Sequence, residues 1–270
     1  MKNRQWLLSI LLLIATQHAI AADDRVNECV ILQAVDSTLD YVSDAAECVV
    51  ATSPASTFKL PHALIALEVG VVTDPLATVP WDGIDYPNAS WKRDHSLDSA
   101  IKWSALWFFQ RTARLIGRAR MLDGLAKLDY AADSYEGEQT EFWRNGDLVV
   151  TPDEQRRFLL RLARNELTVG PQHVEALNEA FLMPPGNVTM AAGEHDFDLQ
   201  WPALRSVHAK TGNTRIKNET ISWLVGYFDA NGTRYVFVAR ARSATSLPST
   251  TGADLAERVL SAQADVLLRK

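Results

Sequence analysis

The stretch Pro54-Ala55-Ser56-Thr57-Phe58-Lys59 places a serine hydroxyl and a lysine amine three residues apart, where an apolar helical pattern begins. Residues i and i+3 lie on one face of a helix, so the Lys59 amine can reach the Ser56 oxygen if both side chains point into a cleft. Serine alone is a poor nucleophile at neutral pH and needs an adjacent base. The S-x-x-K spacing therefore predicts a serine nucleophile with its own lysine base.

A second copy of this tetrad stands at Ser99-Ala100-Ile101-Lys102. Serine and lysine are common residues, so a chain of this length contains about one S-x-x-K by chance at average composition. The tetrad alone is therefore weak evidence, and the motifs around each copy must decide which one carries chemistry.

The N-terminal segment has the parts of a secretory signal peptide. Two basic residues precede an apolar run over residues 6–16, and an A-x-A cleavage pattern ends at Ala21. The run is too short to span a membrane, and we expect no membrane anchor later in the chain. We expect residues 1–21 to be removed and residues 22–270 to form a single secreted or periplasmic domain.

Charge and cysteine content limit the partners and the compartment. The chain carries a formal net charge of -6 at pH 7, so we expect no nucleic acid partner. Its two cysteines, Cys29 and Cys48, lie on either side of a short hairpin pattern. In an oxidising compartment they are expected to form a disulfide worth roughly 3 kcal/mol. The alternative is two buried thiols.

The histidines indicate no metal site. They are scattered along the chain, and none stands in a ligand spacing such as H-E-x-x-H. We therefore expect chemistry that uses no metal ion.

Hydrophobic periodicity divides the chain into an N-terminal hairpin, a helical middle and a strand-rich end. Asn231-Gly232 is a strong hairpin signal, and Thr151-Pro152 is a typical helix start. We expect an α/β (α+β) fold with one central antiparallel sheet made from both ends of the chain, flanked by helices. An all-α lobe is expected as an insertion over roughly residues 70–200. The expected strands are 29–35, 39–42, 206–210, 220–228 and 235–241, and the expected helices are 56–68, 100–120, 122–128, 153–165 and 253–268.

Further motifs accompany the Ser56 tetrad along the chain. They are Ser53-Pro54-Ala55-Ser56-Thr57-Phe58-Lys59 with its continuation over 61–67, Trp103-Ser104-Ala105-Leu106-Trp107-Phe108-Phe109-Gln110, Asp129-Tyr130, Phe142-Trp143, Lys210-Thr211-Gly212, and Ile221-Ser222-Trp223-Leu224-Val225-Gly226-Tyr227. Together and in this order they resemble a class D (oxacillinase-type) serine β-lactamase over essentially the whole mature chain. The resemblance implies the serine β-lactamase and penicillin-binding-protein fold, with hydrolysis of β-lactam antibiotics through an acyl-enzyme on Ser56. It leaves the Ser99 tetrad as a decoy.

The resemblance also implies a modified base. A free lysine has a pKa near 10.4 and is protonated at neutral pH, so it cannot accept the Ser56 proton. Desolvation favours the neutral amine, which takes up carbon dioxide as a carbamate, and in such enzymes the carboxylated lysine is the general base. Carbon dioxide or bicarbonate is then the only cofactor expected. The residues expected around the Lys59 carbamate are Phe58, Leu106, Phe109 and Trp143.

The remaining roles also follow from the resemblance. Ser104 is expected to relay a proton to the departing lactam nitrogen, and Trp143 to hydrogen-bond the carbamate. The backbone N-H groups of Ser56 and Asn213 are expected to form the oxyanion hole. The Lys210-Thr211-Gly212 strand end is expected to face the substrate carboxylate. His208 shares a strand face with Lys210, and packing is its expected role.

Two departures from the family pattern lie close to the expected site. The family's S-x-V is Ser104-Ala105-Leu106 here, and the added methylene of Leu106 crowds the carbamate pocket or reshapes its access to water. The family's Y-G-N is Tyr130-Ala131-Ala132, and a positive φ angle would be awkward for Ala131.

A third departure concerns the arginine that usually binds the substrate carboxylate near the end of the chain. The corresponding stretch over residues 247–252 has no basic residue. Arg240 and Arg242 share one strand face and are candidate substitutes, although solvated surface charges are the simpler interpretation. The hydroxyls over residues 249–251 are a weaker substitute.

Three alternatives stay open. The first is a penicillin-binding receptor or vestigial homologue that acylates and turns over poorly, and the second is a peptidase acting on cell-wall D-Ala-D-Ala. The third concerns the base, because Glu138 and Glu141 precede Trp143 and a loop glutamate can act through water.

Overall fold

The computed structural model describes residues 25–38, 40–131 and 134–267. The predicted signal peptide over residues 1–21 lies outside these ranges. Leu39, Ala132 and Leu268, which belong to the sequence-based expectations, lie outside them as well.

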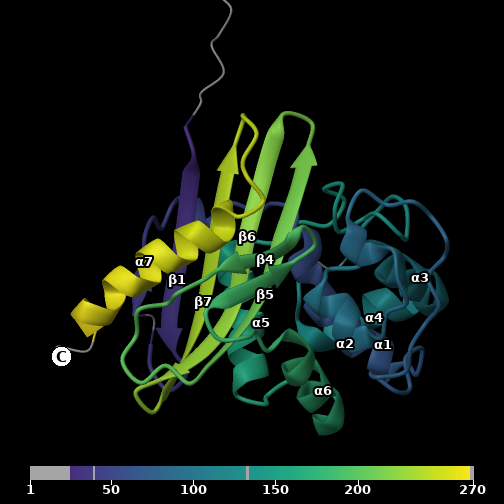
Figure 1. Cartoon of the computed structure of the whole chain (residues 1–270), viewed down its shortest axis with the longest axis horizontal. Coiled ribbons are helices and arrows are strands. Elements are labelled where there is room, and N and C mark those ends of the chain that lie inside the picture. Colours follow the sequence, from purple (N-terminus) through teal and green to yellow (C-terminus); the bar gives the residue numbers. More distant parts are fainter. Residues whose placement is uncertain (1–24, 39, 132–133, 268–270) are drawn as a thin grey trace, which may run out of the picture.

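A five-stranded antiparallel sheet forms the centre of the molecule (Figure 1). Its strands are β1 (Asn27–Ala34), β2 (Tyr41–Val42), β5 (Ser206–Ile216), β6 (Glu219–Ala230) and β7 (Thr233–Ser243). The strand order is β2-β1-β7-β6-β5, so the first long strand pairs with the last one. The predicted hairpin joins β6 to β7, and Asn231 and Gly232 adopt φ angles of 49° and 77°, as this turn requires. The predicted fold class is confirmed.

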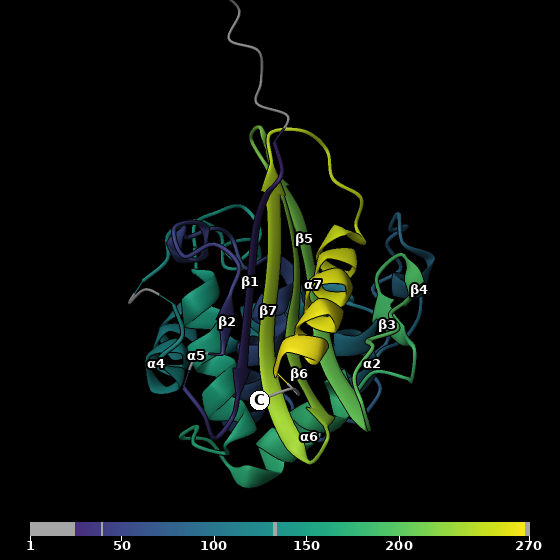
Figure 2. The same cartoon turned by 90° about the vertical axis from the view of Figure 1, so that its left-hand side faces the viewer.

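Helices cover both faces of the sheet, so the inner strands are buried along most of their length. Cys29 and Ile31 of β1 pack into one core, whereas Val30 and Leu32 pack into another, as the two-residue period of a strand requires. The C-terminal helix α7 (Thr251–Leu267) covers the second core, and α5 (Pro152–Ala163) lies on the opposite side of the sheet (Figure 2).

The helix expected over residues 100–120 is wrong as a single element, because the chain breaks there twice. Ser104 has a φ angle of 56° and Gly117 one of 75°, and both values are excluded from a right-handed helix. Three helices result: α2 (Leu97–Lys102), α3 (Leu106–Ile116) and α4 (Arg118–Leu128). The helix expected over 122–128 is the second part of α4.

Helices α1 and α6 lie beside these three helices, whereas α5 lies against the sheet (Figure 1). The helix α6 and the small hairpin of β3 and β4 were not among the expected elements, whereas α5 begins with the predicted Thr151 cap and proline. The remaining bounds are α1 (Lys59–Glu68), α6 (Pro171–Phe181), β3 (Asn187–Met190), β4 (Gly193–Asp196), and the 3-10 turns η1 (Glu47–Val49), η2 (Ala55–Phe58) and η3 (Ala89–Trp91).

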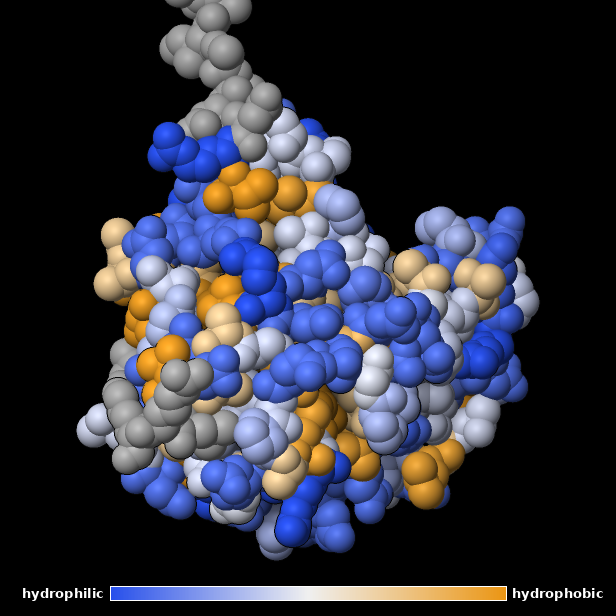
Figure 3. Space-filling view, turned by 60° about the vertical axis from the view of Figure 1, so that its left-hand side comes forward, coloured by the Kyte–Doolittle hydropathy of each residue, from blue (hydrophilic) through white to orange (hydrophobic). Residues whose placement is uncertain are grey.

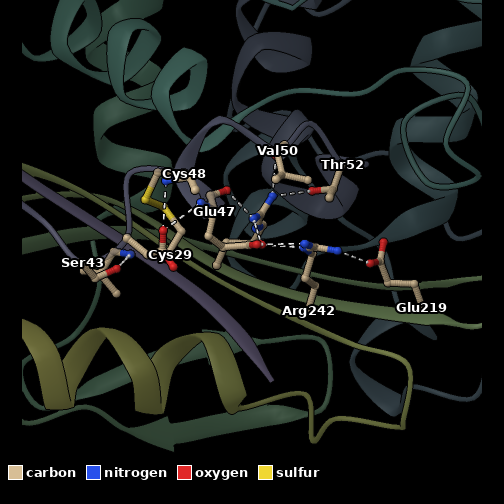
Figure 4. Close-up of polar contacts among 12 residues, drawn as sticks. Cys29, Ser43, Glu47, Cys48, Val50, Thr52, Glu219 and Arg242 are labelled. Carbon is tan, nitrogen blue, oxygen red and sulfur yellow. Dashed lines mark hydrogen bonds and ion pairs between the residues drawn. A yellow bond between two sulfur atoms is a disulfide. The ribbon is translucent and has the colours of Figure 1, made fainter. Parts of the chain in front are cut away.

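The expected disulfide between Cys29 and Cys48 is confirmed, with the two Cα atoms 5.2 Å apart. It fastens η1 to β1 (Figure 4). No helix among the described residues has the length and apolar character needed to cross a membrane. On the face drawn in Figure 3, hydrophilic residues predominate, and hydrophobic residues appear between them as separate groups.

Candidate active site

Ser56 and Lys59 meet where a 3-10 turn passes into a helix. Ser56 lies in η2, and Lys59 is the first residue of α1. The Lys59 Nζ atom lies 2.7 Å from Ser56 Oγ, so the spacing in sequence brings the two groups into hydrogen-bond contact as expected. Ala55, directly before the serine, has a φ angle of 48°, so the backbone that leads into Ser56 has a conformation that is unusual for a residue other than glycine.

Ser104 completes this contact from another part of the chain. Its Oγ atom lies 3.2 Å from Lys59 Nζ, and the residue is 3% exposed. It does not lie within a long helix, as the sequence suggested, but in the break between α2 and α3. Its left-handed backbone conformation therefore presents the hydroxyl to Lys59 from a turn.

The Lys59 amine is buried among aromatic rings. The residue is 1% exposed, and its Nζ atom lies 5.4 Å from the centre of the Phe109 ring. Burial, and then the positive charges of Lys210 and Arg144, hold the pKa of Lys59 well below its usual range. A neutral amine in contact with a serine hydroxyl is a competent base.

Trp143 offers a free hydrogen-bond donor in the same aromatic group. Its ring is buried and stacks on Phe58 at a centroid distance of 5.7 Å. Its Nε1 atom is buried without a hydrogen-bond partner among the described residues. An unpaired buried N-H is costly, and a carboxylate on Lys59 would supply an acceptor. The residues expected around a carbamate therefore fit one, with Leu106 on the pocket wall.

The Lys210-Thr211-Gly212 segment, which the sequence placed at a strand end, lies in the middle of β5 and against the nucleophile turn. A Cβ atom on Gly212 would stand only 3.0 Å from the Pro54 carbonyl oxygen and 3.1 Å from the Thr57 nitrogen, so this close approach requires glycine. Lys210 is buried, its Nζ donates to the Thr211 carbonyl over 3.1 Å, and burial lowers its pKa to about 7.

The outer edge of β5 points its N-H groups toward the site. On this edge the Met183 N-H donates to the Val207 carbonyl over 2.8 Å. The pairing of β5 with β6 is continuous from 206 to 216, so the two-residue period puts the Asn213 N-H on the same outer edge as the Val207 carbonyl. This is the direction that an oxyanion hole shared with Ser56 needs.

These groups open into a pocket of about 220 Å³. Ser249, one of the hydroxyl residues expected as a weaker substitute in carboxylate recognition, lies on the pocket wall. Arg144 was not among the expected site residues, and its only signal in the sequence is a basic residue directly after Phe142-Trp143. The full lining is Ser56, Lys59, Asn88, Trp91, Ser104, Leu106, Arg144, Met190, Ala191, Ala192, Thr211, Asn213 and Ser249.

Arg240 and Arg242 do not substitute for the missing arginine, because both turn to Glu47 of η1 and not to the pocket. Arg240 is fully buried and donates to Glu47 and to the Val50 carbonyl, so it is no solvated surface charge either. Arg242 lies between Glu47 and Glu219 (Figure 4). Neither arginine lines the pocket.

The second S-x-x-K tetrad, the loop glutamate Glu141 and His208 all have structural roles. Ser99 of the decoy tetrad belongs to the capping box that starts α2, and Lys102 pairs with Asp98. Glu141 pairs with an arginine over 2.8 Å and does not line the pocket. His208 stacks on a tyrosine of β6, which is the expected packing role. Among the described residues, no group of three or more His, Cys, Asp or Glu is placed to hold a metal ion.

Residues 33–264 match the family described as the penicillin binding protein transpeptidase domain. The chain belongs to this family. It is 36% identical to β-lactamase OXA-48 of Klebsiella pneumoniae over 194 residues, which are 72% of this chain and 67% of OXA-48. The solved structure of a class D β-lactamase from Bacillus subtilis covers 88% of this chain, and 91% of its own length is matched. The two share 28% identity and a TM-score of 0.75.

These similarities confirm the class D resemblance of this transpeptidase-family chain. A regulatory protein is similar as well: BlaR1 of Bacillus licheniformis is 26% identical over 209 residues, 77% of this chain but only 32% of BlaR1. The transpeptidase family therefore offers both β-lactamases and a regulatory protein for comparison.

Proposed function

We propose that this protein hydrolyses β-lactam antibiotics through an acyl-enzyme on Ser56. The observation that carries the proposal is the contact of one buried amine with two hydroxyls. Lys59 Nζ lies 2.7 Å from Ser56 Oγ and 3.2 Å from Ser104 Oγ at the bottom of a pocket. The similarity to OXA-48, whose name states a β-lactamase, supports the substrate class.

Each group has one task in this reaction. Ser56 Oγ attacks the lactam carbonyl carbon, while the backbone N-H groups of Ser56 and Asn213 stabilise the oxyanion, typically by about 3 kcal/mol per donor. Ser104 delivers a proton to the lactam nitrogen as the ring C-N bond breaks. Lys210 and Thr211 hold the substrate carboxylate at the edge of β5.

We infer further that Lys59 works in a carboxylated form, with carbon dioxide as the only added group. When bound, carbon dioxide gives the lysine an anionic oxygen that serves as a general base. Trp143 Nε1, which has no partner among the described residues, would donate to this group. Phe58 and Phe109 exclude water from the amine, and Leu106 limits the space on the pocket side.

The second candidate function is a penicillin receptor that acylates and releases its product slowly. The similarity to BlaR1 favours it, and so does Leu106, which lines the pocket where the family pattern has the smaller valine and would leave less room for a hydrolytic water. Both functions require Ser56 and differ in the fate of the acyl group.

Mass spectrometry over time, after mixing the purified protein with a penicillin, separates the two. Hydrolysis predicts a mass addition on Ser56 that decays, with sustained colour change from a chromogenic cephalosporin. Stable stoichiometric labelling without sustained colour would establish the receptor. Ser56→Ala should take up no label, and absence of labelling in the unaltered protein would reject both functions.

A further inference from the structure

Arg144 is the one arginine in the described pocket lining, and its backbone is fixed there. The Arg144 carbonyl accepts a hydrogen bond from Thr214 Oγ1 of β5 over 2.9 Å. The carbonyl of the preceding residue, Trp143, accepts one from Ser53 Oγ over 2.8 Å. The peptide that carries the arginine is therefore held between the nucleophile segment and the sheet edge.

The Arg144 side chain is also oriented. Its Nη1 atom lies 2.8 Å from a Glu141 carboxylate oxygen, and the other oxygen of that carboxylate accepts from Gln110 of α3 over 2.6 Å. The arginine side chain remains 40% exposed at the pocket. A cation held in this way keeps its position while the pocket is empty.

This charge acts on Lys59. Arg144 lowers the pKa of Lys59 even though its guanidinium is paired with Glu141. Lys210 lowers the pKa of Lys59 more than Arg144 does, but burial lowers the pKa of Lys210 itself to about 7 and that of His62 to about 3, so neither group keeps a full charge at neutral pH. Arg144 is therefore the permanent cation beside Lys59.

We propose that Arg144 is a positioning residue that drives carboxylation of Lys59. This inference rests on the carboxylation proposed above. In that reaction the Lys59 ammonium first loses a proton, and the lone pair of the neutral Nζ atom forms a bond to the carbon of carbon dioxide while one C–O π bond breaks and its electron pair moves to oxygen. The Nζ atom then loses a second proton. The charge at the site changes from +1 to -1. A fixed cation disfavours the starting ammonium and attracts the product anion, so both effects act in the same direction.

The test compares Arg144→Gln, which removes the charge, with Arg144→Lys, which keeps it. The exposed Arg215→Gln on β5 is the matched control, since it removes an arginine outside the pocket. Each protein is depleted of carbon dioxide and titrated with ¹³C-bicarbonate. The ¹³C carbamate resonance reports carboxylation directly, and recovery of cephalosporin hydrolysis reports it independently.

Arg144→Gln should need roughly tenfold more bicarbonate for half-carboxylation, whereas Arg144→Lys should stay within about threefold of the unaltered protein. Equal bicarbonate requirements for Arg144→Gln and Arg215→Gln would overturn the proposal. A higher KM at an unchanged bicarbonate requirement would also overturn it, because Arg144 would then bind substrate. Absence of the resonance from the unaltered protein would instead reject carboxylation itself.

Discussion

At the scale of single residues, the site depends on lysines that the fold keeps in an unfavourable environment. Lys59 and Lys210 are each 1% exposed, and burial lowers the pKa of both. Neither side chain has a carboxylate partner in the described contacts. Folding must therefore release protons that the unfolded chain would keep, which reduces stability at neutral pH.

Lys210→Met should stabilise the protein at neutral pH. The folded pKa of Lys210 is about 7 and the unfolded value is 10.5, so between these values the unfolded chain holds a proton that the folded chain lacks. The free energy cost of burying Lys210 is therefore greatest at and below pH 7 and disappears as the pH rises toward 10.5. Urea unfolding should show a gain on the order of 2 kcal/mol at pH 7 that shrinks by pH 9. A gain independent of pH would contradict this account.

Ala131→Gly should also stabilise the fold. Ala131 has a φ angle of 61°, the positive value that is awkward for alanine, and glycine adopts this conformation without strain. We expect a gain of about 0.5–1 kcal/mol in the free energy of unfolding. The exposed helical Ala126 of α4 provides the control, because Ala126→Gly should cost about 1 kcal/mol. Destabilisation by both substitutions would refute the role of strain.

At the scale of elements, the site forms where β5 approaches the nucleophile turn η2. Gly212→Ala places a methyl group 3.0 Å from the Pro54 carbonyl oxygen and 3.1 Å from the Thr57 nitrogen, so the strand or the turn must shift by a few tenths of an ångström. Because a misplacement of about 1 Å costs roughly 10²-fold, this smaller shift should reduce the second-order rate of Ser56 acylation by roughly three- to tenfold. Stopped-flow acylation, with thermal unfolding as a check on the fold, measures it. An unchanged rate would show that the turn tolerates a wider spacing.

The strands of the central sheet could be predicted from the sequence, whereas the break between α2 and α3 that positions Ser104 could not. Asn231-Gly232 and the Thr151-Pro152 cap act locally, so their neighbours reveal them. The left-handed turn at Ser104 has no glycine or proline beside it that would indicate a turn. The helical spacing of apolar residues also continues across it without interruption. The order of motifs identified Ser56, Lys59 and Ser104 together, but the position of Arg144 depends on how distant segments fold together.

At the scale of the whole molecule, a buried ion pair joins the start of the chain to its end. Glu47 beside the disulfide accepts from Arg242 of β7 (Figure 4). It also accepts from Arg240 of the same strand. Arg240 has no exposure to water, so its charge depends on this carboxylate.

Glu47→Gln should therefore cost about 3 kcal/mol in the free energy of unfolding, because it leaves the Arg240 charge buried without a counter-charge. Glu219→Gln removes the second partner of Arg242, and because the Glu219 side chain is 38% exposed, this change should cost less than about 1 kcal/mol. Chemical denaturation of both variants tests the contrast. Similar losses in both variants would show that the buried ion pair contributes no more to the free energy of unfolding than the exposed one.

The pairing of β1 with β7 also constrains how the chain is made. Asn27 finds its partner Arg242 only after more than 200 further residues have been synthesised, at rates of about 5–20 residues per second. Until β7 is synthesised, the edge of β1 that pairs with β7 has no partner strand, and the apolar faces of β1 can aggregate with other chains. Truncation before β7 should leave an aggregation-prone, protease-sensitive product. Refolding of the full chain should be slow, because the paired strands lie far apart in the sequence.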